Sequence, residues 1–429
     1  MSAFAPTSPR TNGSFLRRNA IWFVALGVAL LLPQVTRSGI GIAVLNQMFI
    51  MVIFSLSYNM LLGQGGMLSF GHAVYFGLGG YFTIHLMEMA GDGAFFMPLP
   101  LVPLAGGIAG LLFGLIFGSF STNRAGTVFA MISLGIGEMI AASSLIFTKF
   151  SGGEEGITSD RTELTPFFGA KFGSDLEVYY LIAAWMMLSI WLMYRLSRTP
   201  VGRMANAVRD NPERAEFVGY SQKQVRFLSF MGAGFFAGIA GGLFALNYEI
   251  VTEETVNLVT SGTVLLQAYI GGVGFFAGPI VGAIVYTLLQ TLLSNYTEIW
   301  ALYVGLVFVA TVMYAPAGLT GLIMMHVPIY RAGKLGSLAL PYLRIGAPVL
   351  SCAIGVIGLL EMLQFLSVRS VGEASHELFW VTVNVEQPVA WIIFAALAVG
   401  GFVITRRMAP AVVAAWDAAS QHAYARRGP

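Results

Sequence analysis

The stretch that decides the fold is NAVRDNPERAEFVGYSQKQVRFLSFMGAGFFAGIAGGLFAL, residues 206–246. Its first half is rich in charged side chains, whereas the 20 residues from Phe227 to Leu246 contain none. A continuous apolar run of about 20 residues has the length that a helix needs to cross a bilayer. The stretch therefore predicts a charged loop that leads directly into a membrane-spanning helix.

The rest of the chain has the composition of a membrane protein. Of its 429 residues, 56% are hydrophobic and 10% are charged, and the mean hydropathy is +0.75. The apolar runs are continuous and not alternating, which favours helices over barrel strands. We therefore predict an all-α polytopic membrane protein. Its net charge of +2 predicts no nucleic-acid partner, and with one cysteine, Cys352, it forms no internal disulfide.

The apolar runs predict about twelve membrane crossings. The expected spans are roughly 20–34, 42–62, 67–90, 99–120, 125–149, 178–196, 225–249, 255–274, 277–296, 299–325, 345–366 and 388–405. Lys and Arg are retained on the cytoplasmic side of such spans. With the N-terminus inside, this arrangement places 18 of the 23 basic residues in the cytoplasm and 5 outside. We therefore expect both termini to be cytoplasmic.

The charged loop has two interpretations. Seven Lys or Arg and three acids lie between Arg195 and Phe227, and they could serve only as a topology signal. Their order also predicts a short helix, because Asp, Asn and Pro are typical of helix starts and early acids favour the helix dipole. The residues of this start are Asp210, Asn211, Pro212, Glu213 and Glu216. A helix so short is marginal in water, which favours a docked partner.

Four ordered groups of motifs carry a family resemblance. They are residues 206–246, quoted above; SYNMLLGQGGMLSFGHAVYFGLGGY at 57–81; ISLGIGEMI at 132–140 with SGGEEGI at 151–157; and IGGVGFFAGPIVGA at 270–283 with APAGLTGL at 315–322. They resemble the LivM-like permease subunits of ABC importers for branched-chain amino acids. The resemblance covers roughly residues 40–325 and implies about ten core transmembrane helices. Two further C-terminal spans are not matched.

The resemblance implies a transport subunit and not an enzyme. Such a subunit would pair with a homologous LivH-like permease, two cytoplasmic ATP-binding subunits and a periplasmic substrate-binding protein in the bacterial inner membrane. ATP and magnesium would bind to the partner subunits, so no cofactor, catalytic or metal site is expected in this chain. The residues agree, since the nearest approach to a phosphate-binding loop is Gly333-Lys334, followed by Leu335, with Pro328 where its first glycine belongs.

Topology and resemblance together divide the chain into five segments. They are a cytoplasmic leader at 1–19, a transmembrane permease domain at 20–330 that contains a cytoplasmic coupling loop at 197–224, a cytoplasmic linker at 331–344, an additional pair of spans at 345–405, and a cytoplasmic tail at 406–429. The coupling loop would dock its helix in a groove of an ATP-binding subunit. The resemblance makes the small residues Ala215 and Gly219 contact positions, beside Asp210, Asn211, Pro212 and Glu213.

Two glycine-rich turns are candidates for the translocation pathway. Such turns either unwind helices so that backbone groups face a cavity, or permit close helix packing. In the first turn, His72 is either an interhelical hydrogen-bonding residue or a ligand. The first set of candidates is Gln64, Gly65, Gly66, Ser69, Phe70 and His72, and the second set is Gly272, Gly278 and Pro279.

Acidic side chains give further candidates. Glu138 lies within a predicted span, where an ionisable group is costly; it either lines a pathway or interface, or holds helices together. Glu361 is also intramembrane, with no assigned role. The outer loop, residues 151–177, carries six acids, which either steer a binding protein or are simply solvated.

The resemblance favours hydrophobic amino acids as the substrate, with urea or short amides as an alternative. A different class is an ion-coupled secondary transporter, which would need an intramembrane relay. Only Glu138, Glu361 and His72 are available for one. A membrane sensor would need a sizeable soluble domain, and the sequence predicts none.

Overall fold

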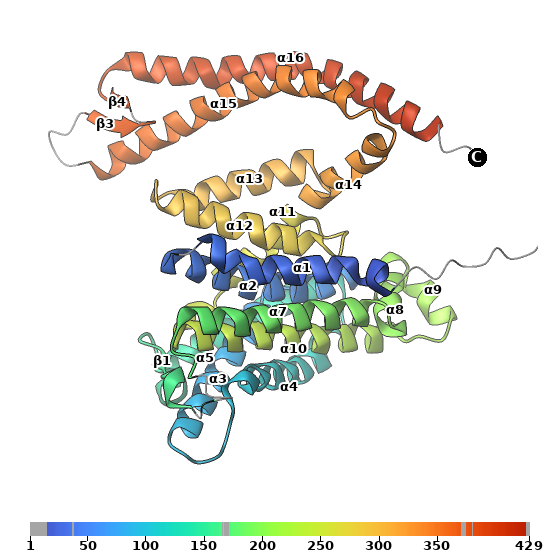
Figure 1. Cartoon of the computed structure of the whole chain (residues 1–429), viewed down its shortest axis with the longest axis vertical. Coiled ribbons are helices and arrows are strands. Elements are labelled where there is room, and N and C mark those ends of the chain that lie inside the picture. Colours follow the sequence, from blue (N-terminus) through green and yellow to red (C-terminus); the bar gives the residue numbers. More distant parts are fainter. Residues whose placement is uncertain are drawn as a thin grey trace, which may run out of the picture. The chain divides into compact units, whose positions relative to one another are not determined.

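The computed structural model describes residues 15–36, 38–164, 166, 171–369, 375–379 and 381–425. Predictions that concern residues 1–14, Arg37 and residues 426–429 lie outside the described residues. The described chain is helical almost throughout, which confirms the all-α prediction (Figure 1). The long apolar runs form the helices because every backbone polar group is then satisfied within the segment.

The structure has sixteen α-helices among the described residues. Their bounds are α1 Phe15–Thr36, α2 Gly39–Asn59, α3 Ala73–Gly91, α4 Pro103–Ser121, α5 Gly126–Ile146, α6 Thr148–Ser151, α7 Asp175–Ser197, α8 Pro200–Asp210, α9 Pro212–Phe217, α10 Gln222–Tyr248, α11 Leu258–Gly271, α12 Gly278–Ser294, α13 Trp300–Tyr314, α14 Gly318–Arg331, α15 Gly336–Val368 and α16 Pro388–Ala425. Shorter turns are the π-helix η1 Met60–Gln64 and the 3-10 helices η2 Leu99–Leu101, η3 Arg161–Glu163 and η4 Glu253–Thr255.

Two small antiparallel pairs of strands complete the described elements. The strand β1 Ile157–Thr158 pairs with β2 Ile250–Val251, and β3 Ser375–Leu378 pairs with β4 Val381–Asn384. In the first pair Ile157 lies opposite Val251, which ties the outer loop to the segment that follows α10.

Seven helices of the described residues are long and apolar enough to cross a membrane, or eight if one bent pair counts as a single span. These correspond to eight of the twelve predicted crossings. The other four correspond to α1, α3, α11 and α12. In α11 the helix has 14 residues and in α12 it has 17, so both are shorter than a straight crossing needs.

The sequence predicts one continuous helix at 299–325, and this prediction is wrong because the segment is broken into α13 and α14. The two helices meet at an angle of 44°. Pro316 lacks a backbone donor and disfavours helical geometry in the residue before it, and Ala315 accordingly has φ −135° and ψ 64°. Gly318 then adopts φ +69°, a conformation that glycine accepts readily.

The C-terminal helices extend beyond the predicted spans. Helix α15 already begins at Gly336, within the segment expected as a linker, and α16 continues to Ala425, through most of the expected tail. The chain divides into two compact units, residues 1–288 and 289–429. In the second unit α15 packs antiparallel to α16, with Gly355 against Ala398 and Gly401 against Cys352.

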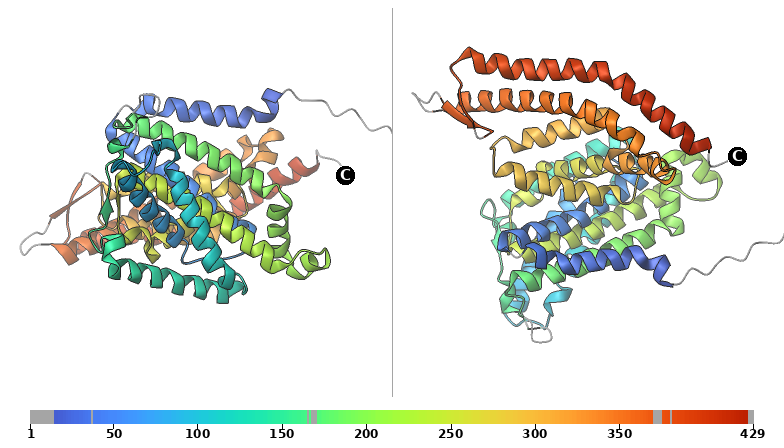
Figure 2. Two further views of the ribbon diagram at one scale, coloured as in Figure 1. Left: turned by 90° about the horizontal axis from the view of Figure 1, so that it is seen from below. Right: turned by 45° about the horizontal axis from the view of Figure 1, so that its top comes forward.

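Helix α10 is the centre of the first unit. It packs against α2, α3 and α4, and glycines allow backbones to touch at these contacts. Gly238 lies against Gly79 of α3 and Gly106 of α4, while Gly234 lies against Gly110. Helices α8 and α9 lead into the start of α10, and β2, which pairs with β1, follows its end, so the two groups lie at opposite ends of this unit (Figures 1 and 2).

Candidate functional site

The coupling loop contains two short helices. In α9 the side chain of Asn211 accepts a hydrogen bond from the Arg214 backbone N–H at 3.0 Å, and Pro212 occupies the first turn. The predicted helix start is therefore confirmed at Asn211 and Pro212, whereas Asp210 is the last residue of α8. Helix α8 was not predicted, although Thr199 and Pro200 give the same signal: the Thr199 hydroxyl accepts from the Gly202 N–H at 3.4 Å.

Helix α9 folds back on α8 and α10. Ala215 is only 3% exposed and belongs to a small apolar cluster with Ala205, Val208 and Val225. Its small side chain thus lets three helices of this chain approach one another. Gly219 is exposed, has φ +88°, and has no atom close to the position of a Cβ.

The outer tip of α9 is apolar. The side chain of Phe217 is 91% exposed and that of Val218 is 70% exposed. Around them, Asp210, Glu213, Arg214 and Glu216 are exposed as well. A bulky apolar tip with a charged rim is typical of a surface that binds another protein. Sequence reasoning missed Phe217 and Val218, although two large apolar residues in a charged loop were a visible signal.

Arg209 connects the coupling loop to the first glycine-rich turn, residues 63–72. From the end of α8, its Nη1 donates a hydrogen bond to the carbonyl oxygen of Gly63. Its Nε and Nη2 both contact Asp210 Oδ1 at 2.9 Å. The aliphatic part of the arginine packs on Gly66, where an added Cβ would lie 2.7 Å from Arg209 Cγ. Gly66, at φ +64°, therefore suits both the turn and this contact.

The glycine-rich turn is unwound but held by neighbouring helices. The π-helix η1 ends at Gln64, and α3 begins only at Ala73, six residues later than the predicted start at 67. The Phe70 N–H donates to the Ser133 hydroxyl of α5, and the Ala73 N–H to the Ser261 hydroxyl of α11, both at 3.0 Å. Side chains of other helices thus bind the backbone groups that the helices leave free.

His72 is a fully buried interhelical residue. The Ser57 hydroxyl donates to the Phe54 carbonyl at 2.7 Å and lies 3.0 Å from His72 Nε2. Because the single hydroxyl proton is used, His72 Nε2 is the donor in that pair. Its Nδ1 has no hydrogen-bond partner among the described residues, like the buried hydroxyls of Tyr58 and Ser69. The ring stacks on Phe54 with an interplanar angle of 10°.

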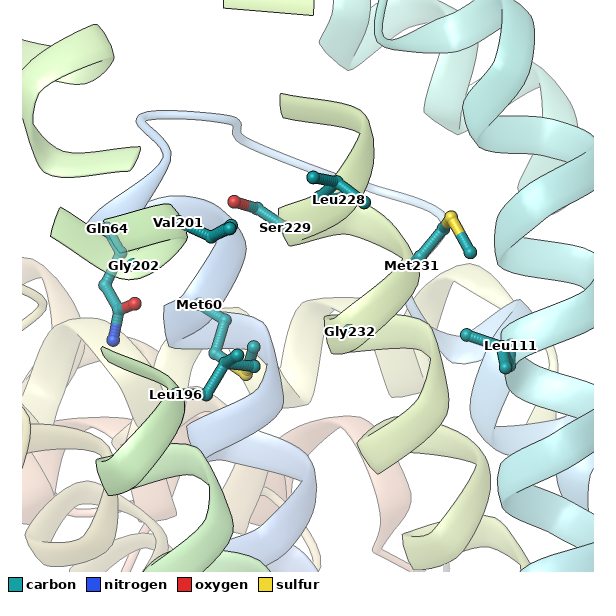
Figure 3. A pocket seen from close by; sticks show the side chains of 10 residues that line it. All are labelled: Met60, Gln64, Leu111, Leu196, Val201, Gly202, Leu228, Ser229, Met231 and Gly232. Atoms are coloured by element: carbon teal, nitrogen blue, oxygen red, sulfur yellow. The ribbon is translucent and has the colours of Figure 1, made fainter. Parts of the chain in front are cut away.

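A cavity of about 270 Å³ lies beside the coupling loop (Figure 3). Met60 and Gln64 of η1 line one side, Val201 and Gly202 of α8 line another, and Ser229 of α10 lines a third. The cavity therefore borders the π-helix, α8 and α10 together.

The second glycine-rich turn, between α11 and α12, is tightly packed. Gly272 adopts φ +110°, and a Cβ at Gly278 would collide with the Gly272 carbonyl oxygen. Pro279, also buried, lies in the first turn of α12. These three predicted residues serve close packing of the two helices, which was one of the two interpretations of the turn.

Glu138 lies on an exposed face of α5. It makes no hydrogen bond or ion pair with the described residues, and Met131, Gly135 and Met139 are exposed on the same helix. The opposite face of α5 is buried through residues such as Phe129, Ser133 and Gly137. Glu138 therefore does not hold together helices within the described chain.

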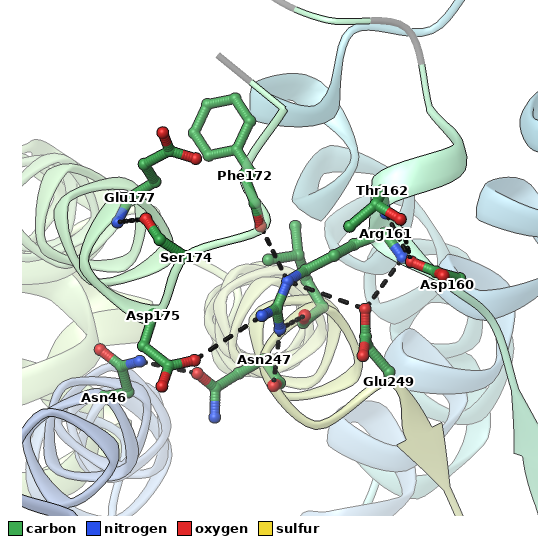
Figure 4. Close-up of polar contacts among 11 residues, drawn as sticks. Asn46, Asp160, Arg161, Thr162, Phe172, Ser174, Asp175, Glu177, Asn247 and Glu249 are labelled. Carbon is green, nitrogen blue, oxygen red and sulfur yellow. Dashed lines mark hydrogen bonds and ion pairs between the residues drawn. The ribbon is translucent and has the colours of Figure 1, made fainter. Parts of the chain in front are cut away.

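The outer loop is anchored by Arg161, whose side chain is 11% exposed (Figure 4). Its guanidinium donates to the carbonyl oxygens of Phe172 at 2.9 Å and Asn247 at 3.1 Å, and lies 3.7 Å from carboxylates of Asp175 and Glu249. It therefore ties the loop to the end of α10.

Asp160 stabilises the turn before Arg161. Hydrogen bonds from the Thr162 hydroxyl and backbone N–H, both 2.7 Å long, lower the pKa of this carboxyl. Glu154 and Glu155 remain exposed on the loop. The loop is thus a folded surface that presents acids. No sequence pattern distinguished Arg161 from the other basic residues.

The family comparison agrees with this arrangement. The family described as branched-chain amino acid transport system / permease component matches residues 40–316. The chain belongs to this permease family. The LivM resemblance is thereby confirmed, and the chain is a multi-pass transport subunit. The match includes both glycine-rich turns, the coupling loop, Glu138 and the outer loop.

Relatives of the permease show the range of the family. The chain is 29% identical over 334 residues to the high-affinity branched-chain amino acid permease protein LivM of Escherichia coli, covering 72% of this chain and 77% of the relative. It is 24% identical over 273 residues to the probable permease LivH of Methanocaldococcus jannaschii, covering 59% and 82%. It is 26% identical over 199 residues to the guanosine permease NupQ of Bacillus subtilis, covering 44% and 61%. No solved structure matches the chain.

Proposed function

We propose that this permease is one of two homologous membrane subunits of an ABC importer for branched-chain and other hydrophobic amino acids in a bacterial inner membrane. The observation that carries the proposal is the exposed Phe217 tip on α9, joined through Arg209 to the glycine-rich turn. ATP and magnesium are assigned to two ATP-binding partner subunits. The basic residues of the coupling loop support its placement in the cytoplasm, with both termini on the same side.

The coupling step follows from these contacts. An ATP-binding subunit binds the α9 tip and moves α9 together with α8, because Ala215 and Val208 pack these two helices against each other. Arg209 transmits that movement to Gly63, and the cavity beside Gln64 gives the turn room to respond. Coupling of this kind needs an element with two arrangements, and the π-helix η1 is the candidate here.

Replacing Phe217 by Asp should weaken the association of the ATP-binding subunits with the permease. The change removes an aromatic anchor of the kind that contributes about 2 kcal/mol or more to binding. Co-purification from detergent should fall by at least about tenfold. Phe96 is 74% exposed on the segment between α3 and α4, at the other end of the unit, so Phe96→Asp is the matched control. Equal co-purification of both variants would contradict the assigned docking tip.

Glu138 is assigned to the translocation pathway, on the face of α5 that the described residues leave exposed. A carboxylate in the middle of a membrane helix costs about 2.5 to 3.5 kcal/mol when it faces lipid, which favours a partner or an aqueous pathway over it. Glu138→Gln should leave co-purification of the second permease intact and lower the initial uptake rate by about tenfold at neutral pH. Glu88→Gln, at the end of α3, removes the same charge and should change uptake little. Wild-type uptake by Glu138→Gln would exclude a charge-based role.

The LivM and LivH relatives support hydrophobic amino acids as the substrate. In cells that contain the complete transporter, unlabelled leucine, isoleucine and valine should compete with labelled leucine. Urea, acetamide and guanosine should not compete. Competition by urea or acetamide alone would move the substrate to the short amides, and competition by guanosine alone would move it to nucleosides.

A further inference from the structure

The C-terminal unit contains a second and larger cavity, which is lined partly by residues 289–310 of the matched region and partly by residues 353–379 beyond it. Its volume is about 780 Å³, within the range of roughly 300 to 1,000 Å³ that is typical of ligand sites. The end of α12, helix α13, helix α15 and the strand β3 frame it. Most of its walls are apolar, through residues such as Leu293, Leu306 and Val356.

A buried acid interrupts these apolar walls. Glu361 of α15 is only 8% exposed, and its Oε1 accepts a hydrogen bond from the Tyr303 hydroxyl at 2.7 Å. Its second carboxylate oxygen accepts no hydrogen bond from the described residues. That oxygen faces the cavity, where a hydrogen-bond donor or a cation from a ligand would offset the cost of burying the carboxylate.

The charges that line the cavity limit which ligand groups can bind to Glu361. Glu377 of β3 is a second acid in the lining, and none of the lining residues is Lys, Arg or His. An anionic group placed at Glu361 would therefore meet two acids and no base, so the group of a ligand that contacts Glu361 is neutral or cationic. The apolar walls, in turn, suit a hydrocarbon chain better than a free polar cation.

The position of the acid suits the end of a membrane lipid. Glu361 lies seven residues before the end of α15 at Val368, or about 10 Å along the helix, and Tyr303 lies in the first turn of α13. The polar part of the cavity is thus near one end of these helices. A chain could extend from there along Leu306 and Val356.

From this geometry we propose that the cavity binds an aminophospholipid, with the primary ammonium on Glu361 and an acyl chain along the walls of α13 and α15. A primary ammonium supplies both the positive charge and the hydrogen-bond donors that the free carboxylate oxygen requires. A quaternary ammonium supplies charge without N–H donors. The site therefore discriminates lipids by their headgroup and does not depend on transport.

Native mass spectrometry of the purified full-length chain tests this proposal. The probes are phosphatidylethanolamine, phosphatidylcholine and phosphatidylglycerol with identical acyl chains. We expect phosphatidylethanolamine to be retained about tenfold more than phosphatidylglycerol, with phosphatidylcholine between them, as one hydrogen bond to a charged group would give. In Glu361→Gln, retention of phosphatidylethanolamine should fall to about that of the other two lipids.

Two further variants make the outcome decisive. Glu298→Gln removes the same charge at the same end of the unit. Glu298 accepts a hydrogen bond from the Gln364 side chain at 3.1 Å and does not line the cavity. This variant should therefore keep the preference for phosphatidylethanolamine. Val356→Trp fills the cavity without changing charge and should lower retention of phosphatidylethanolamine. Equal retention of the three lipids by the wild type, an unchanged preference in Glu361→Gln, or full retention by Val356→Trp would each overturn the proposal.

Discussion

Gly238→Leu is expected to remove nearly all folded permease from the membrane. Gly238 lies in α10 where that helix meets α3 and α4, and any Cβ there collides with the Gly106 carbonyl of α4. Gly79 of α3 lies on the same contact, with its own Cβ position 2.6 Å from Gly238 Cα. The obstructing atoms are backbone, so no side chain can rotate away.

The size of this effect follows from the packing. Overpacking one well-packed position costs about 1 to 3 kcal/mol and occasionally more, and a leucine here has to separate three helices. The yield of monodisperse protein after mild detergent extraction should fall by at least about tenfold. Gly262→Leu, in α11, is the matched control, because no atom lies within 4 Å of its Cβ position. Equal yields from both variants would show that α10 does not hold the unit together as described.

Arg209→Ala is expected to uncouple ATP hydrolysis from transport. The variant loses the hydrogen bond from α8 to Gly63 and the contact with Asp210 within α8, while the α9 tip with Phe217 stays in place. The ATP-binding subunits should therefore still bind and hydrolyse ATP. Uptake should fall by roughly 5- to 150-fold, the range of typical coupling free energies.

The comparison that isolates Arg209 is with Arg203→Ala, which removes the same charge from an exposed position of α8. Reconstituted complexes should be assayed for both hydrolysis and uptake. Normal uptake in Arg209→Ala would exclude the link to the glycine-rich turn. A loss of association with the ATP-binding subunits would instead place Arg209 in the docking surface.

Much of the fold could be predicted because the membrane restricts the choices. A segment such as 227–246 can satisfy its backbone in lipid only as a helix, so span positions follow from composition. The start of α9 could also be predicted, since Asn211 and Pro212 act locally. The break at Pro316 was visible in the sequence as well, but the continuous apolar run around it concealed the bend.

The contacts that give the site its properties could not be read from the sequence. Arg209 reaches Gly63 across 146 positions of the chain, and Arg161 reaches Asn247 across 86. Nothing in the composition distinguishes these arginines from neighbours such as Arg203 that contact nothing comparable. The packing of α9 on α8 decides which face of α9 is covered. Ala215 is therefore buried between helices of this chain, whereas Phe217 is exposed at the tip of α9.

In the proposed transporter, ATP hydrolysis on partner subunits drives transport through this permease. The most direct measurement is uptake of labelled leucine by cells that express the complete transporter, with either active or hydrolysis-dead ATP-binding subunits at equal abundance. We expect leucine accumulation with the active subunits and background uptake with the dead ones. Equal accumulation in both strains would contradict the claim and favour an ion-coupled secondary transporter.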